Sequence, residues 1–443
     1  MYQHKIIGCR PKKVKRISRA WLYRRCPYAD CGGTGVLKRK KERKVLDICL
    51  GSLLLLLLTL GMYRCRRCGR YFTARVEGIR PKARFTDRVR ALVVRALVLY
   101  NMAYERVREY LYLEWGLDLS IGFLHDCFRW AVNQVDMDKY VAWAASNFSG
   151  VLCLDEVHDG KFTILFATDP LNDFTVGFRL VESNDQANMN GFLQYLRSKG
   201  IEPEVVITDG SPLYKEALFE YFETCEHQLC IFHVLRDLNE EILREFRKIA
   251  RQLQVNVKHG RGRPRKRGRK RKDPAWRRKF ANKHAYLIVK REDRLTKEDR
   301  KNLAKLFALS PKFRVLRRVA TQTLKLFSQE IEKSTARRRR TVLLREIEQA
   351  GLEDLAKVFK AKLKEEKFER MITFMGWANV DRTTNHVERN NRSFRMIQKT
   401  RYRRRRRHTI EGALWLDLLR RQDRHPLAKP ADLQLPWVTG KAA

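Results

Sequence analysis

Three acidic residues stand where a divalent-metal nuclease needs carboxylates. Asp155 ends an apolar run at residues 151–154, and Asp209 ends another at residues 205–208. Glu388 lies in a run that has the pattern of a helix start. Ligands of an open α/β sheet gather at the carboxyl ends of its strands. Two such carboxylates and one from a helix could hold two Mg²⁺ ions, or Mn²⁺ in their place, roughly 4 Å apart, and so clamp the reacting oxygens of a phosphodiester.

The alternative for either aspartate is structural. An Asp that follows a buried strand is often a turn residue or a helix N-cap, and the sequence from Asp209 to Pro212 has the pattern of a turn into a helix. The order of the surrounding strands, their spacing and the strongly basic chain together favour the catalytic interpretation.

The elements predicted around these acids would bring Asp155 beside Asp209. Alternating patterns predict three strands of an antiparallel meander, at residues 151–157, 162–168 and 174–180. They are followed by a helix, a strand at 205–208, a helix at 212–222, a strand at 227–232 and a long helix to residue 249. This is the element order of an RNase H-like α+β fold, in which the first and fourth strands are neighbours.

The third acid lies far along the chain. Asp209 and Glu388 are 179 positions apart, against 54 between the two aspartates, so we expect a helical insertion at residues 251–375. Without an insertion, the third acid would be one of four residues on the long helix: Asp237, Glu240, Glu241 or Glu245. Glu388 is preferred because helical spacing puts it on one face with groups that could contact phosphates: Asn391, Arg392 and Arg395.

Four cysteines in two close pairs form a second candidate metal site. Cys26 and Cys31 make a C-x4-C pair, and Cys65 and Cys68 make a C-x2-C pair followed by glycine. Four thiolates suit tetrahedral Zn²⁺, and glycine permits the tight turns between ligands. Ten cysteines without a secretory leader argue against a disulfide framework. We therefore expect a zinc ribbon with one structural Zn²⁺, with unliganded thiols as the alternative.

A helical stretch follows the cysteine pairs. Its second predicted helix spans residues 104–113, and its third begins after Ser120, with a turn at Gly116 between them. Two short helices across such a turn resemble a helix-turn-helix, whose second helix could enter a major groove. Arg129 and Asn133 are then candidate outward-facing DNA readers. An ordinary helical hairpin is the alternative.

The charge of the chain points to a polyanionic partner. The formal net charge is +44 and the pI is about 10.3, which favours DNA or RNA, with an anionic membrane surface as the second choice. The leucine run at residues 53–58 lies in an apolar segment shorter than the roughly 20 residues of a membrane-spanning helix. It therefore predicts a strand or a buried helix. The basic N-terminus lacks the apolar region of a signal peptide, and we expect a cytoplasmic protein associated with the nucleoid, or a nuclear one in a eukaryotic host.

A second basic segment lies in the expected insertion. Ten of the fifteen residues from Lys258 to Lys272 are Lys or Arg. The sequence Arg261-Gly262-Arg263-Pro264 reproduces an AT-hook core, in which Arg261 and Arg263 would enter a narrow minor groove. A disordered linker that binds phosphates is the alternative.

Three runs give the chain a family resemblance. Residues 207–214, 228–239 and 384–392 resemble DDE transposases of Mutator-like elements and related bacterial insertion sequences. The resemblance implies two Mg²⁺ ions on Asp155, Asp209 and Glu388. It also implies a C-x2-H pair, matched here by Cys230 and His233.

Two neighbouring features need their own interpretation. Glu156 follows the first acid directly, but strand alternation is expected to turn it to the other face. Cys225, His227, Cys230 and His233 have a spacing that invites a zinc-finger interpretation. We prefer packing and a local hydrogen bond for Cys230 and His233, which would support the wall of the active site.

These expectations combine into a DNA transposase that binds transposon ends and cleaves and joins strands, as a homo-oligomer on double-stranded DNA. The alternatives are a non-catalytic DNA-binding regulator derived from a transposase and a structure-selective nuclease. The expected domains are a basic N-terminus with the zinc ribbon, the helix-turn-helix region, the first part of the core, the insertion, the last part of the core and a tail: residues 1–80, 81–148, 149–250, 251–375, 376–425 and 426–443.

Overall fold

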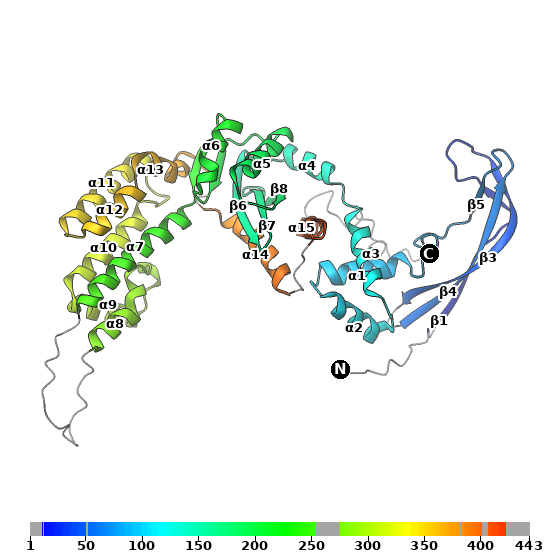
Figure 1. Cartoon of the computed structure of the whole chain (residues 1–443), viewed down its shortest axis with the longest axis horizontal. Coiled ribbons are helices and arrows are strands. Elements are labelled where there is room, and N and C mark those ends of the chain that lie inside the picture. The colour runs from blue at the N-terminus through cyan, green and yellow to red at the C-terminus, as the bar shows by residue number, and fades with distance from the viewer. Residues whose placement is uncertain are drawn as a thin grey trace, which may run out of the picture. The chain divides into compact units, whose positions relative to one another are not determined.

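The computed structural model describes two compact units of mixed α and β structure (Figure 1). One unit comprises residues 1–143 and 390–443, and the other comprises residues 144–389. The described residues are 11, 13–49, 52–253, 275–378, 380, 383–400 and 406–421. The proposed AT-hook core at residues 261–264 lies outside them.

A sheet built on a long hairpin forms the first part of the N-terminal unit. Its strands are β1 (Lys13–Arg19), β2 (Tyr23–Arg25), β3 (Thr34–Cys49), β4 (Ser52–Cys65) and β5 (Tyr71–Thr73), in the order β1-β4-β3-β2 with β5 also on β4. The leucine run lies in β4 and is therefore a strand, not a buried helix. Alternate side chains along it, Leu56, Leu58 and Leu60, are buried in one cluster.

Helices complete the N-terminal unit. They are α1 (Asp87–Val98), α2 (Tyr104–Trp115), α3 (Ile121–Val132), α4 (Met137–Ser146) and α15 (Arg407–Arg421). Ser120 caps α3 by accepting a hydrogen bond from the Phe123 backbone, and Gly116 ends α2 with a φ of 69°. Both elements thus begin and end close to where the sequence predicts. α15 packs on α3, where Gly412 meets Val132 and Phe128.

The second unit contains a five-stranded sheet with the predicted neighbours. Its strands are β6 (Val151–Asp159), β7 (Phe162–Asp169), β8 (Phe174–Val181), β9 (Val205–Thr208) and β10 (Glu226–Leu229), in the order β10-β9-β6-β7-β8. β6, β7 and β8 form an antiparallel meander, and β9 pairs parallel with both β6 and β10. α5 (Gln186–Ser198) and α6 (Pro212–Tyr221) connect these strands.

One predicted boundary is wrong. The last strand was expected to reach residue 232, but it ends at Leu229, and α7 (Ile231–Gln252) begins after Cys230. Ile231 belongs to the helix because it starts the buried stripe that continues through Leu238, Ile242 and Phe246. Four apolar or sulfur-containing residues in a row do not distinguish a strand from such a helix start.

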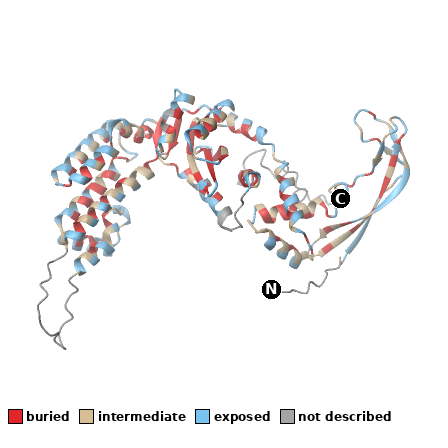
Figure 2. Ribbon diagram, viewed as in Figure 1, coloured by how far each residue is buried: buried red, intermediate tan, exposed pale blue. Residues whose placement is uncertain are grey.

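A bundle of helices packs around α7 (Figures 1 and 2). Its members are α8 (Trp276–His284), α9 (Lys297–Leu309), α10 (Pro311–Lys325), α11 (Lys333–Gln349), α12 (Glu353–Lys362) and α13 (Glu365–Met371). Stacked rings of Phe246 and Phe313, with centroids 4.3 Å apart, join α7 to α10. None of the helices in the described part of the chain has the length and apolar character needed to cross a membrane.

The chain leaves the bundle at a buried contact with the sheet. The side chain of Gln228 on β10 donates to the Met371 carbonyl (3.1 Å) and accepts from the Phe374 backbone N–H (2.7 Å). Gln228 is fully buried, so both amide atoms need these partners. The contact fixes the point from which the chain proceeds to α14 (Asn385–Thr400), the helix that carries Glu388.

Candidate metal centres

Strand pairing places Asp155 and Asp209 at the same edge of the sheet. Cys153 on β6 lies opposite Ile207 on β9 in the parallel ladder, so two residues further along Asp155 comes level with Asp209. Residues an even number apart share a face of a strand. The two carboxylates accordingly approach within 4.8 Å of each other.

The turn after β9 leaves Asp209 available to a ligand. Ser211, not Asp209, is the N-cap of α6, and its hydroxyl accepts from the Leu213 backbone. One Asp209 oxygen accepts a hydrogen bond from the Ser211 backbone N–H at 2.8 Å. Asp209 therefore supports the turn with Oδ1, as the structural alternative expects, while its carboxylate also belongs to an acidic group.

Glu156 joins this acidic group, and the expectation that strand alternation turns it away is wrong. Its carboxylate lies within 4.8 Å of those of Asp155 and Asp209. β9 ends at Thr208, so Asp209 lies in the turn beyond the sheet, where the longer Glu side chain can reach it. The buried Tyr214 of α6 lowers the pKa of Glu156 and so opposes part of the effect of burial.

Burial and mutual repulsion disfavour the charged forms of these acids. Burial, together with the charge of Asp209, raises the pKa of Asp155 to about 6 and that of Glu156 to about 7. The Glu156 backbone N–H, 2.9 Å from Asp155 Oδ1, opposes the shift of Asp155.

Three carboxylates this close together repel one another, and a divalent cation bound among them would relieve the repulsion. Three carboxylates in a chain of strongly positive charge converge on one point, and Glu156 Oε1 is buried without a hydrogen-bond partner. Oxygen ligands of this kind are those that Mg²⁺ and Mn²⁺ prefer. A cation bound among Asp155, Glu156 and Asp209 would remove the repulsion that raises their pKa values.

The start of α14 holds Glu388 near this group. The negative charge of Glu388 raises the pKa of Asp155, and Glu388 Oε1 lies 3.7 Å from Nε2 of His233 on α7. Thr384, just before the helix, donates from its backbone N–H (3.3 Å) and its hydroxyl (3.2 Å) to Cys230 Sγ. Contacts between the start of α7 and the start of α14 thus position Glu388.

Cys230 and His233 also affect each other's protonation. The neighbouring Cys230 raises the pKa of His233. Burial of the Cys230 thiol is outweighed by the effects of His233 and Thr384, so that the pKa of Cys230 is lowered. His227 instead bonds Thr208 Oγ1 at 2.9 Å. No metal-binding group is formed by Cys225 and these three residues within the described ranges.

A second contact holds the same helix turn from the other side. His386 Nε2 lies 2.7 Å from Oδ1 of Asp173, in the turn between β7 and β8, and Arg389 pairs with the same carboxylate at 3.3 Å. Val387 between them is fully buried. The side chain of Glu388 is thereby directed from a fixed helix start.

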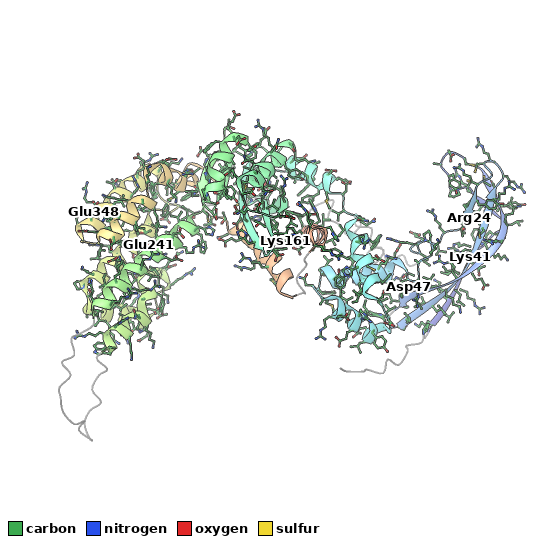
Figure 3. The ribbon with its side chains drawn as sticks, viewed as in Figure 1. Arg24, Lys41, Asp47, Lys161, Glu241 and Glu348 are labelled. Atoms are coloured by element: carbon green, nitrogen blue, oxygen red, sulfur yellow. The ribbon has the colours of Figure 1, made fainter. Side chains whose placement is uncertain are left out.

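The four alternative third acids face a different environment. Asp237 pairs with Lys362 of α12 at 3.5 Å, Glu241 with Arg244 at 2.6 Å and Glu245 with Lys248 at 3.4 Å. Glu240 is exposed. Glu241 lies among the helices of the bundle, in the same part of the molecule as Glu348 (Figure 3). None of the four belongs to the acidic group found among the described residues.

The four cysteines of the N-terminal unit form the other centre. One sulfur from each of Cys26, Cys31, Cys65 and Cys68 lies within 4.8 Å of the others, and the first three side chains are buried. A Cβ on Gly33 would lie 3.0 Å from Cys65 Sγ and 3.2 Å from Cys31 Sγ. Glycine is therefore required for the sulfurs to converge.

The surroundings of the sulfurs differ in charge. Burial raises the pKa of Cys26 to about 12, whereas the Arg70 guanidinium, 3.4 Å from Cys68 Sγ, lowers the pKa of Cys68 to about 6. Arg70 also pairs with Asp30 at 2.6 Å and stacks on Tyr28. Four sulfurs within reach of one ion are the ligand set of a structural Zn²⁺ site.

A comparison with models of known families identifies the group to which these centres belong. Residues 152–407, more than half of the chain, match the ISL3-type DDE transposase model. The chain belongs to this transposase family. The predicted resemblance to DDE transposases of insertion sequences is therefore confirmed. The match includes Asp155, Asp209 and Glu388. No curated protein matches the chain.

Membership of the transposase family implies a DNA substrate and gives the exposed basic residues a context. Arg129 and Asn133, at the end of α3, are exposed, as are Arg392 and Arg395 of α14. Asn391 is buried and does not share their exposed face, contrary to the expected grouping. Its position one residue before Arg392 turns it about 100° around the helix.

Proposed function

We propose that this member of the transposase family binds the ends of a mobile element and catalyses metal-dependent DNA strand cleavage and transfer. The observation that carries the proposal is the acidic group formed by Asp155 and Glu156 within β6 and by Asp209 just after β9, with Glu388 held beside it by α14. Asp155, Asp209 and Glu388 are its proposed catalytic residues, and Glu156 is an additional ligand.

The proposed cofactors are two Mg²⁺ ions, or Mn²⁺, held by these carboxylates. Such ions would supply activation of water for cleavage and of a DNA 3′-hydroxyl for joining. Asp155 and Asp209 would hold them from the sheet, and Glu388 would hold them from the helix. Since the nucleophile comes from solvent or DNA, no side chain needs to form a covalent bond with the substrate.

The strand order supports an RNase H-like core for this reaction. Reading β8-β7-β6-β9-β10, three antiparallel strands precede two parallel ones, with the first and fourth strands adjacent. The helical bundle interrupts this core between β10 and α14. We retain the proposed domain limits at residues 80, 148, 250, 375 and 425.

The N-terminal unit is the proposed reader of the element's ends. The cysteine centre holds one structural Zn²⁺, and α2 and α3 act as a helix-turn-helix with Arg129 and Asn133 directed to DNA bases. Their exposure and the capped, Gly-containing turn support this assignment. Arg392 and Arg395 contact phosphates, and the protein acts as a homo-oligomer on DNA.

The test is a cleavage and joining assay with the full-length protein, Mg²⁺ and a duplex that carries the element's own ends. The proposal expects cleavage at the ends followed by joining to target DNA, both dependent on the metal. Glu241→Gln, which removes an acid of the bundle, should retain both reactions. Cleavage of branched DNA without joining would instead identify a nuclease, and end binding without any cleavage would identify a regulator.

A further inference from the structure

A basic groove lies on one face of the β3–β4 hairpin, beside the cysteine centre. It has a volume of about 500 Å³. Its rim carries five cationic side chains and none of its lining residues is acidic; the five are Arg39, Lys41, Arg43, Arg75 and Lys82. This groove involves none of the residues assigned above to zinc, to base recognition or to catalysis.

Strand geometry explains why the cations gather on one face. Arg39, Lys41 and Arg43 alternate along β3, and their partners on β4 are Met62, Leu60 and Leu58. Partners in an antiparallel ladder share a face, so a row of cations runs beside an apolar row. The intervening acid of β3, Glu42, is directed to the opposite face by the same alternation.

Most of these cations are available to a ligand. Lys41, Arg75 and Lys82 are exposed, and within the described residues their side chains form no ion pair or hydrogen bond. Arg43 has a structural task, because it donates to the Ala83 carbonyl at 2.5 Å and so holds the segment that closes one end of the groove.

The floor of the groove argues against an apolar ligand. Leu58 and Leu60 are only 1% and 5% exposed because they pack in the core of the sheet. A lipid tail or hydrophobic peptide would gain little area there, whereas an anionic ligand would meet unpaired charge along the rim. Successive cations on β3 are about 7 Å apart, which corresponds to two nucleotide steps of about 3.4 Å along a duplex.

We propose that the basic groove binds the sugar–phosphate backbone of duplex DNA without regard to sequence, and so sets the position from which α3 reads bases. This inference rests on the proposed transposase function. Phosphate contacts fix the register of a protein on DNA, while base contacts specify the sequence.

The test compares two triple variants of the full-length protein. The groove variant carries Lys41→Gln, Arg75→Gln and Lys82→Gln. The control carries Arg16→Gln, Lys40→Gln and Lys44→Gln, which removes the same charge from exposed positions on the opposite face of the sheet. Binding to a random-sequence duplex is measured at several salt concentrations, and zinc content and melting temperature verify folding.

The groove variant should lose affinity for every duplex. The slope of log binding constant against log salt concentration should become shallower by about 2.7, which is about 0.9 for each of the three lost phosphate contacts. The control should change the slope by less than one third of that. Equal changes in both variants, or none in the groove variant, would overturn the inference. So would loss of binding to phosphatidylserine vesicles with DNA binding retained. Wild-type protein that cleaves and joins DNA in the same experiment would show that only the groove assignment, and not the proposed function, has failed.

Discussion

The cysteine centre is assembled from residues close together in the sequence, whereas the acidic centre brings together residues that are far apart. The four sulfurs come from two short turns within residues 26–68, where Gly33 permits the close approach of Cys31 and Cys65 and Arg70 compensates charge at Cys68. The acidic group takes its members from β6 and from the turn after β9, and Glu388, 179 positions after Asp209, is held beside it by α14.

The difference suits the cysteine centre to stability and the acidic centre to chemistry. An ion held by all four sulfurs would have a closed tetrahedral set of protein ligands, as in structural sites. In the acidic centre, burial and the neighbouring negative charges raise the pKa values of Asp155 and Glu156. A metal ion should therefore stabilise the fold at the first centre and support chemistry at the second.

The largest effect should come from the cysteines. Cys65→Ser with Cys68→Ser should reduce bound zinc from about one ion per chain to none and abolish cooperative unfolding of the N-terminal unit, since structural zinc supplies folding free energy. Elemental analysis and calorimetry measure both. Cys49→Ser, a change outside the centre, should retain the zinc. If the double variant kept its zinc, the four cysteines would not be the zinc ligands, and the proposed difference between the two centres would be wrong.

Substitution of the acids should affect reaction and leave the fold intact. Asp155→Asn, Asp209→Asn and Glu388→Gln should each lower the rate of strand cleavage by about a thousandfold or more, because the lost ligand weakens several kcal/mol of charge stabilisation. DNA binding should remain close to wild type in filter or gel assays.

The same acidic substitutions test whether the acidic centre, unlike the cysteine centre, contributes nothing to the stability of the fold. Without metal, Asp209→Asn should not lower the melting temperature, since it removes repulsion among buried carboxylates. Glu241→Gln is the matched control and should preserve cleavage. Full activity of Glu388→Gln would reassign the third acid to the long helix.

Protonation of His227 should oppose folding of the second unit at low pH. Burial lowers its folded-state pKa to about 3 from an ordinary 6.5, so the stability that depends on neutral His227 is present above pH 6.5 and is lost as pH falls toward 3. Between pH 7 and 5 the loss should be about 2 kcal/mol. The difference in urea unfolding free energy between wild type and His227→Gln should therefore shift by that amount between pH 7 and 5, in the direction of a more stable variant at pH 5. The difference between wild type and His158→Gln, at an exposed position, should not shift.

The smallest effect should come from the support of Glu388. Thr384→Val removes the hydroxyl donor to Cys230 Sγ and should cost about 1 kcal/mol of stability, with a measurable fall in cleavage rate. Thr373→Val removes another buried hydroxyl of the same unit, which bonds the His227 carbonyl at 3.1 Å. It should cost similar stability but spare cleavage. Equal losses of activity would mean that Thr384 acts through stability alone.

Sequence reasoning worked where a pattern was local. A buried run that ends in an acid placed Asp209 directly after a strand, and the order of strands brought it beside Asp155. The same pattern was wrong for the end of the first strand, because β6 continues past Asp155 to Asp159. The caps at Ser120 and Gly116 marked helix boundaries for the same reason. Each of these features depends on a few consecutive residues whose backbone conformations are strongly restricted.

Sequence reasoning failed where a side chain departs from the regular strand pattern. Strand alternation predicted that Glu156 faces away from Asp155. However, β9 stops before Asp209, and the carboxylates of Glu156 and Asp209 lie close together. The adjacent Asp-Glu pair was a signal that could have been used. The hairpin of β3 and β4 was also missed, because the charged run in β3 gave no apolar alternation and only its partner strand explains it.

The contact between Gln228 and the residues that end the bundle also orders the assembly of the protein in time. It joins positions more than 140 residues apart, a closure that must await synthesis of the whole bundle. At 5–20 residues per second, about 10–35 s of translation separate Asp209 from Glu388. A nascent chain therefore carries both aspartates without its helix-borne acid, and Glu388 can join them only after the whole bundle has been synthesised.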